Sequence, residues 1–126
     1  MRRIAGADRA ANPVDPANFV LPGSFQRLVG ADDDAGARLY RVAFEEGART
    51  YWHEHDDFQI LFGLSGRCVV VDRSGEELVL EPGDVVVVEP GEEHWHGAAP
   101  DGPGEHLAIN LGEVTTWLES SAAEGA

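Results

Sequence analysis

The sequence predicts an all-β protein, a sandwich or barrel of short strands, on two observations. Turn signals containing glycine or proline recur at close, even intervals along the 126 residues, and short strand-like runs lie between them. Many short strands at such spacing are typical of sandwiches and barrels. A chain of this length forms one domain with a sizeable core.

The predicted strands follow one another through the middle and the end of the chain, each bounded by turn signals such as Glu46-Gly47 and Pro90-Gly91. They are Phe25–Val29, Arg38–Phe44, Phe58–Leu64, Arg67–Asp72, Glu77–Leu80, Asp84–Glu89, Glu93–Gly97 and Glu105–Leu111. Val114–Glu119 is compatible with a final strand or a last helical turn.

Three parts of the chain are distinguished by their composition. Residues 1–18 contain Asn12-Pro13-Val14-Asp15-Pro16 and little periodicity, which predicts an N-terminal arm or the lead-in to an edge strand. Residues 19–118 contain the regularly spaced glycine and proline turn signals and are expected to form the barrel. Residues 119–126 are small and polar, and we expect a flexible tail.

The charge of the chain restricts its partners. Twenty-three acidic residues against nine basic ones give a net charge of −14, and all nine bases are arginine. A field of that sign repels phosphate backbones and anionic lipids, so neither nucleic acid nor a membrane is an expected partner. The absence of lysine excludes Schiff-base chemistry, pyridoxal phosphate anchoring and a Walker-type phosphate loop. A small-molecule substrate is the expected partner.

The sequence also indicates a compartment. Apolar runs such as Val85–Val88 are too short to cross a bilayer, and no basic stretch followed by an apolar one opens the chain. The single cysteine, Cys68, cannot form an internal disulfide, which suits a reducing compartment. We therefore expect the protein in the cytoplasm, with Cys68 as a buried structural thiol.

All five histidines, at positions 53, 55, 94, 96 and 106, lie in three strand-like segments. Side chains two or four residues apart on a strand point to the same face, so an unbroken strand would turn His53, His55 and Gln59 into the interior together. An apolar interior does not accommodate so many imidazoles unless a metal or a substrate compensates. Imidazole suits Zn, Fe, Ni, Cu and, in mixed nitrogen and oxygen sites, Mn. The pattern therefore predicts a metal site.

Two motifs in this region resemble those of the cupin superfamily. The first, with cupin spacing throughout and glutamine where most cupins carry glutamate, consists of Gly47, His53, His55, Gln59 and Gly66. The second consists of Gly83-Asp84, Gly91 and His94. The resemblance implies the cupin double-stranded β-helix, a jelly-roll barrel.

A closer resemblance lies in the histidine pair with its following glutamine, in His-Trp-His-Gly-Ala-Ala-Pro from residue 94, and in His-Leu-Ala-Ile from residue 106. These are similar to a bacterial subgroup of carboxymuconolactone-decarboxylase-like cupins that includes manganese-dependent hydroxynitrile lyases. The resemblance implies one divalent metal ion, with Mn favoured and Fe, Zn, Ni or Co as alternatives. It implies His53, His55, Gln59 and His94 as the ligands and His106 as a base in the cavity.

The ligand set indicates the chemistry. Three neutral imidazoles and a neutral amide leave a divalent ion its full charge, which makes it a stronger Lewis acid than a site containing glutamate. Four protein ligands leave one or two places for a substrate or dioxygen, as in catalytic sites. We expect His106 and His96 on the open side of the metal as proton-transfer groups, and Tyr40, Val42 and Asn110 in the substrate pocket.

The leading hypothesis is a metal-dependent lyase that cleaves a carbon–carbon bond of a small hydroxy compound. The alternatives are an Fe- or Mn-dependent oxygenase, a cyclase or isomerase acting on an enolisable carbonyl compound, and a non-catalytic metal- or ligand-binding cupin. A homodimer is also expected, because an exposed edge strand is a liability that a second copy covers. In that dimer the segment Phe19–Phe25 is expected to cross to the partner.

Overall fold

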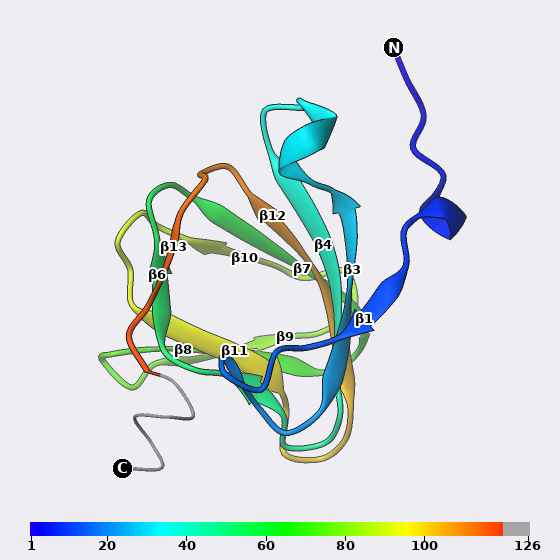
Figure 1. Cartoon of the computed structure of the whole chain (residues 1–126). Coiled ribbons are helices and arrows are strands. Elements are labelled where there is room, and N and C mark those ends of the chain that lie inside the picture. Colours follow the sequence, from blue (N-terminus) through cyan, green and yellow to red (C-terminus); the bar gives the residue numbers. More distant parts are fainter. Residues whose placement is uncertain (120–126) are drawn as a thin grey trace.

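The computed structural model describes residues 1–119, which form a barrel of two facing sheets (Figure 1). The first sheet has six strands in the order β1 (Ala11–Pro13), β3 (Gly23–Val29), β4 (Arg38–Phe44), β12 (Gly104–Asn110), β7 (Gln59–Gly66) and β10 (Val85–Val88). The second has β13 (Thr115–Trp117), β6 (His53–His55), β11 (His94–Ala98), β5 (Arg49–Thr50) and β2 (Phe19–Val20), with β8 (Cys68–Asp72) on β11 and β9 (Glu77–Leu80) on β8.

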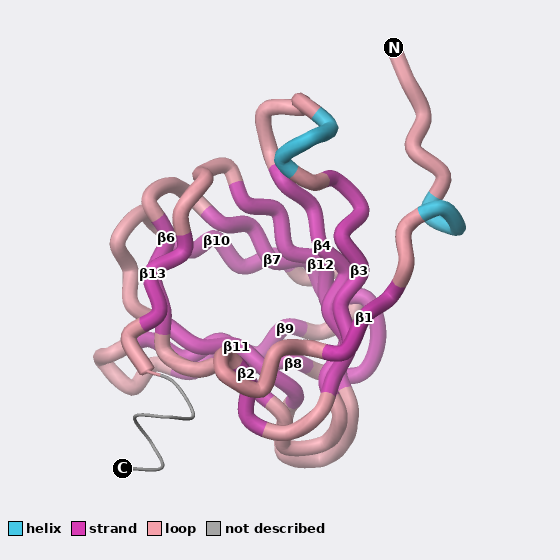
Figure 2. Tube along the Cα trace, viewed as in Figure 1, coloured by secondary structure: helices cyan, strands magenta, loops and turns pink. Residues whose placement is uncertain are grey.

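Neighbouring strands in both sheets pair antiparallel, which confirms the predicted all-β class. Figure 2 shows the strands surrounding the interior, with loops at both ends of the barrel. Two short 3-10 turns, η1 (Gly6–Asp8) and η2 (Ala31–Asp33), are the helical elements of residues 1–119. No helix in this part of the chain has the length and apolar character needed to span a membrane.

All eight predicted strands are present, and their bounds lie within two residues of the predicted ones. β4 and β9 have the predicted bounds, and the segment after Val114 is a strand, β13, rather than a helical turn. The strands that were not predicted, β1, β2 and β5, have two or three residues each. Runs that short do not complete a period-two pattern, so the alternation signal does not detect them. The predicted tail lies outside the described residues from Ser120 onward.

The apolar core lies between the two sheets. Alternate residues of β10 show the pattern: Val86 and Val88 are buried, whereas Val85 and Val87 are more than half exposed. Inward-facing side chains from both sheets form one cluster, namely Val42, Phe44, Ala48, Leu61, Cys68, Val70, Leu80, Val86, Val88, Ala98 and Ala108. Burial also raises the pKa of the Cys68 thiol to about 12, which fits the predicted structural role.

The chain changes sheets between His55 and Gln59, so the expectation of one unbroken strand through these residues is wrong. β6 ends at His55 in the second sheet and β7 begins at Gln59 in the first, because the chain turns the barrel corner at residues 56–58. The Asp56 carboxylate holds this corner by accepting the backbone N–H of Val114 over 3.1 Å. The side chains of His53, His55 and Gln59 are nevertheless all buried, because strands from both sheets face the same interior.

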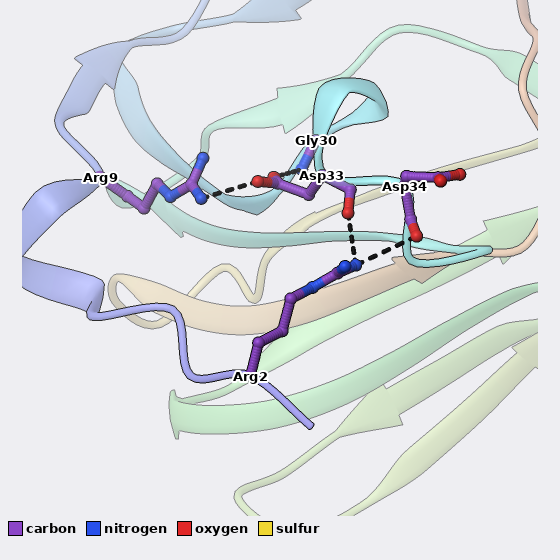
Figure 3. Close-up of polar contacts among 5 residues, drawn as sticks. All are labelled: Arg2, Arg9, Gly30, Asp33 and Asp34. Carbon is purple, nitrogen blue, oxygen red and sulfur yellow. Dashed lines mark hydrogen bonds and ion pairs between the residues drawn. The ribbon is translucent and has the colours of Figure 1, made fainter.

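The N-terminal residues are held against the loop that contains η2 (Figure 3). Arg2 donates to the backbone carbonyls of Asp33 and Asp34, and Arg9 forms a 2.8 Å ion pair with the Asp33 carboxylate. The same carboxylate accepts the N–H of Gly30. Further along, β2 pairs with β5 and β3 with β4 of the same chain. The homodimer stays a prediction.

Candidate metal centre

Five imidazoles and the amide of Gln59 are buried in the barrel interior, each side chain at most 7% exposed. They come from four strands of both sheets: His53 and His55 (β6), Gln59 (β7), His94 and His96 (β11) and His106 (β12). Strand pairing places them together, since His94 lies opposite His53 and Gln59 lies opposite Asn110. Burying so many polar groups is unfavourable unless each is paired or bound.

Backbone carbonyls determine the tautomers of two of these imidazoles. His53 Nδ1 lies 2.8 Å from the carbonyl oxygen of Tyr51, and His94 Nδ1 lies 2.8 Å from that of Glu92. A carbonyl oxygen only accepts, so in each ring Nδ1 carries the hydrogen and Nε2 presents a lone pair. This is the arrangement in which an imidazole binds a metal through Nε2 while its other nitrogen fixes the ring.

The third imidazole of the predicted ligand set has a buried nitrogen without a partner. His55 Nδ1 lies 3.0 Å from the hydroxyl oxygen of Thr115, whereas its Nε2 is inaccessible to solvent and has no hydrogen bond. A buried nitrogen of this kind is satisfied when an ion binds to it. The His55 side chain therefore fits a metal ligand.

The amide of Gln59 completes the set. Its nitrogen donates to Asn110 Oδ1 over 2.8 Å, which turns its oxygen toward His94 Nε2 at 3.1 Å. Both the amide oxygen and the His94 Nε2 lone pair are acceptors, so they repel each other unless a cation lies between them. The donor set as a whole, three imidazole nitrogens and one amide oxygen, fits a divalent ion of the first transition row.

A second grouping overlaps the first. His53, His94 and His96 each offer a nitrogen within 4.8 Å of the other two, close enough for one ion to bridge them. The ring centroids of the predicted set are similarly close, at 4.3 Å for His53 and His94, 5.0 Å for His53 and His55, and 5.3 Å for His55 and His94. Three buried histidines close enough to bind a metal are thus present in the barrel.

Burial keeps the imidazoles neutral. It is the largest cause that lowers the pKa of each of the five, and it lowers the pKa of His55 and of His106 to about 4. Neighbouring imidazoles add to the effect, as His94 does for His53. At neutral pH the rings are therefore in the form that binds metal or accepts a proton.

His96 and His106 form a buried pair. His106 Nε2 lies 2.9 Å from His96 Nδ1, and His106 Nδ1 is buried without a partner beside the Phe44 ring. His96 lines the cavity, whereas His106 is fully buried behind it. The structure thus brings His96 to the cavity, whereas His106 on β12 is not among the lining residues. The position of either ring relative to a metal stays a prediction.

The cavity next to the histidines has a volume of about 350 Å³. Its polar lining includes His53, His55, Gln59, His96 and Asn110, and its apolar lining includes Tyr40, Val42, Phe19, Phe25 and Trp117. Tyr40, Val42 and Asn110, which are expected in the substrate pocket, all line this cavity. Their contact with a substrate stays a prediction. A volume of this size fits a small molecule.

Several lining residues were not predicted. Trp117 packs its ring 4.6 Å from that of His53, and Phe19 lies next to Trp117 with ring centroids 6.3 Å apart. Both belong to strands of two or three residues, which gave no periodic signal. Phe25 and Arg27 could have been predicted as lining residues, because they lie two residues apart in a predicted strand and so share one face of it.

Comparisons with known proteins agree with this architecture. A sequence model described as a cupin domain matches residues 40–110. The (R)-mandelonitrile lyase of Granulicella tundricola is 44% identical over 96 residues, which cover 73% of this chain and 72% of that protein.

Solved structures show the same fold. A cupin-like protein from Thermotoga maritima is 37% identical with a TM-score of 0.76, covering 85% of this chain and 84% of that one. The polyketide cyclase RemF from Streptomyces resistomycificus has the same TM-score at 19% identity, covering 94% and 85%, and shows likeness of fold alone. The cupin domain model matches more than half of the chain, and a relative of 44% identity covers 73% of it. The protein therefore belongs to the cupin family.

Proposed function

We propose that this cupin is a divalent-metal-dependent lyase that cleaves a carbon–carbon bond of a small hydroxy compound, with a cyanohydrin as the first candidate. The observation that carries the proposal is the burial of His53, His55, Gln59 and His94 side by side next to the cavity, with ring centroids 4.3 to 5.3 Å apart and the Gln59 oxygen 3.1 Å from His94 Nε2. The identity to a protein named for mandelonitrile cleavage supports the reaction class.

The metal would be held by these four residues. In each of them the side-chain nitrogen that does not face the metal lies within hydrogen-bond distance of a neutral partner. The partners are the carbonyls of Tyr51 and Glu92, the Thr115 hydroxyl and the Asn110 amide oxygen. Such outer contacts orient metal ligands. His96, by contrast, is paired with another titratable ring, which suits proton transfer better than ligation.

With four neutral ligands, a bound divalent ion would keep its full charge and supply a Lewis acid that lowers the pKa of a substrate hydroxyl. We favour manganese, with iron, zinc, nickel or cobalt as alternatives that the same donors accept.

The proton would be carried by the His96 and His106 pair. When His96 Nδ1–H donates to His106 Nε2, His96 Nε2 presents a lone pair to the cavity and accepts the hydroxyl proton. The carbon–carbon bond then breaks, and its electron pair leaves with the departing carbon. A lone pair of the deprotonated hydroxyl oxygen forms the second bond of the carbonyl group. The departing carbanion, cyanide in the case of a cyanohydrin, takes the proton back from the imidazolium.

The test is carbonyl release from mandelonitrile by protein purified without chelators, in air and under argon, beside elemental analysis. The proposal expects release that is independent of oxygen, lost on chelation and restored by adding back Mn²⁺. Release that requires oxygen would favour an oxygenase. No release from this or other hydroxy compounds, with full metal occupancy, would favour a cyclase, an isomerase or a binding module.

A further inference from the structure

Arg27 is the cationic residue among those that line the cavity, whose imidazoles are neutral at pH 7. It lies on β3 and pairs with Tyr40 of β4, which lines the same cavity. Its side chain is exposed, so the guanidinium stands where the cavity meets solvent.

The backbone around Arg27 is shaped to place this side chain. The pairing of β3 with β4 shifts register between Arg27 and Val29, and such bulges at a barrel rim re-aim a side chain. Gly30 then leaves space for the arginine stem, since a Cβ at Gly30 would lie 2.9 Å from Arg27 Cδ. The guanidinium carbon lies 5.7 Å from the Phe25 ring centroid and 5.8 Å from that of Tyr40. Two aromatic rings and a glycine thus position one cation.

Arg27 forms no ion pair within residues 1–119, although the chain carries 14 more acidic than basic residues. Four other arginines, namely Arg9, Arg41, Arg67 and Arg73, each pair with a carboxylate. One acid, Asp15, does line the same cavity, but its Oδ1 accepts the backbone N–H of Ala17 over 2.9 Å within its own turn. The guanidinium is therefore left with its hydrogen-bond donors facing the cavity mouth or solvent.

We propose that Arg27 binds a carboxylate on the substrate. The ligand class is a small hydroxy compound with a planar apolar body, its hydroxyl end toward His96 and its carboxylate at the guanidinium. Phe19, Phe25 and Tyr40 supply apolar walls for such a body. A guanidinium binds a carboxylate through two parallel N–H donors, which fixes the ligand orientation. The hydroxyl end rests on the proposed function, whereas the carboxylate subsite does not require the metal.

The experiment compares two probes of nearly equal size, 4-(hydroxymethyl)benzoate and 4-(hydroxymethyl)benzamide, by calorimetry on metal-loaded and metal-free protein. We expect the benzoate to bind about tenfold tighter than the benzamide in both forms, as a hydrogen bond to a charged group predicts. Arg27→Gln should abolish the preference, and Arg27→Lys should keep part of it. Gly30→Ala should reduce it by displacing the arginine stem, and Asp15→Asn should increase it.

The matched control is Arg41→Gln, which removes an exposed arginine of the adjacent strand that is paired with Glu105. It should leave both affinities unchanged. Equal affinity for the two probes in the wild type would overturn the proposal, as would a preference that survives Arg27→Gln. An Arg27-dependent preference for the benzoate in metal-free protein would support the carboxylate subsite even if no lyase activity is found. Carbonyl release without any charge preference would retain the lyase and remove the subsite.

Discussion

Asn110 accepts the amide nitrogen of Gln59 over 2.8 Å, and this contact turns the Gln59 oxygen toward His94 Nε2. The two residues lie opposite each other on β12 and β7, so strand pairing itself maintains the contact. A glutamine amide can present either its oxygen or its nitrogen, and only the oxygen binds a cation. The orientation of the Gln59 amide therefore determines whether its oxygen is available as the proposed fourth ligand.

Replacing Asn110 tests this orientation directly. Asn110→Leu keeps a similar size but removes the acceptor, so the Gln59 amide is free to rotate. We expect metal affinity to fall about tenfold, as is usual when an outer contact of a ligand is lost. Competition with a chromogenic chelator measures it. Asn110→Asp keeps an acceptor and adds a negative charge, so its metal affinity should not fall. Equal affinities of wild type and Asn110→Leu would contradict the assignment.

Gln59→Glu should have opposite effects on binding and on activity. A carboxylate adds a negative charge to the site, so metal binding should tighten by tenfold or more. The same charge makes the ion a weaker Lewis acid, and carbonyl release per bound metal should slow. Chelator competition and turnover at full occupancy check the two effects. Unchanged metal affinity would mean that Gln59 is not a ligand.

The fold and the interior position of the candidate ligands were predictable because each has a local signal. Glycine and proline turns separate the strands, and an even spacing places His53 and His55 on one face. The corner after His55 was not predictable, because the same alternation fits one continuous strand or two strands in facing sheets. The interior position of Gln59 therefore agreed with the prediction although its premise, an unbroken strand, was wrong.

The cavity walls were less predictable because they depend on pairing between distant segments. Trp117 reaches His53 through the pairing of β13 with β6, some sixty residues apart in the chain. Trp52 and Trp95 precede histidines directly, so alternation turns them outward, where they stack on Arg73 and Arg49. No local sequence pattern shows that Trp117, which is distant in the chain, packs beside the site while Trp52 and Trp95 do not.

Metal binding and folding should be separable. His94→Ala should remove the metal but leave the far-ultraviolet circular dichroism unchanged, because the apolar cluster rather than an ion forms the core. Leu61, with no exposed surface, provides the comparison. Leu61→Ala should lower the free energy of unfolding by about 2–5 kcal/mol while the protein that remains folded still binds metal. Full metal occupancy in His94→Ala would sink its assignment as a ligand.

Acid should destabilise the metal-free protein. The pKa of His55 and of His106 is about 4 in the fold and 6.5 in the unfolded chain, so the unfolded chain binds more protons between these values. The contribution of these imidazoles to the free energy of unfolding is therefore fully present above pH 6.5. It is lost as the pH falls toward 4, by roughly 3 kcal/mol for His106 alone. Thermal unfolding from pH 7.5 to 4.5 measures the loss. His106→Phe should show a shallower dependence, and a flat wild-type profile would contradict the burial of neutral imidazoles.

The last prediction separates the two roles open to His96. If His96 transfers protons with His106 behind it, His106→Phe should keep the metal and reduce turnover about a hundredfold or more, since the His96 Nδ1 hydrogen loses its acceptor. His106→Gln offers an amide oxygen to the same hydrogen and should recover part of the rate. His96→Ala should likewise retain metal. If instead His96 is a ligand with His53 and His94, His96→Ala should lose the metal, and His106→Phe should change affinity more than rate at saturation. Elemental analysis of both variants, beside turnover at full occupancy, decides between the two arrangements.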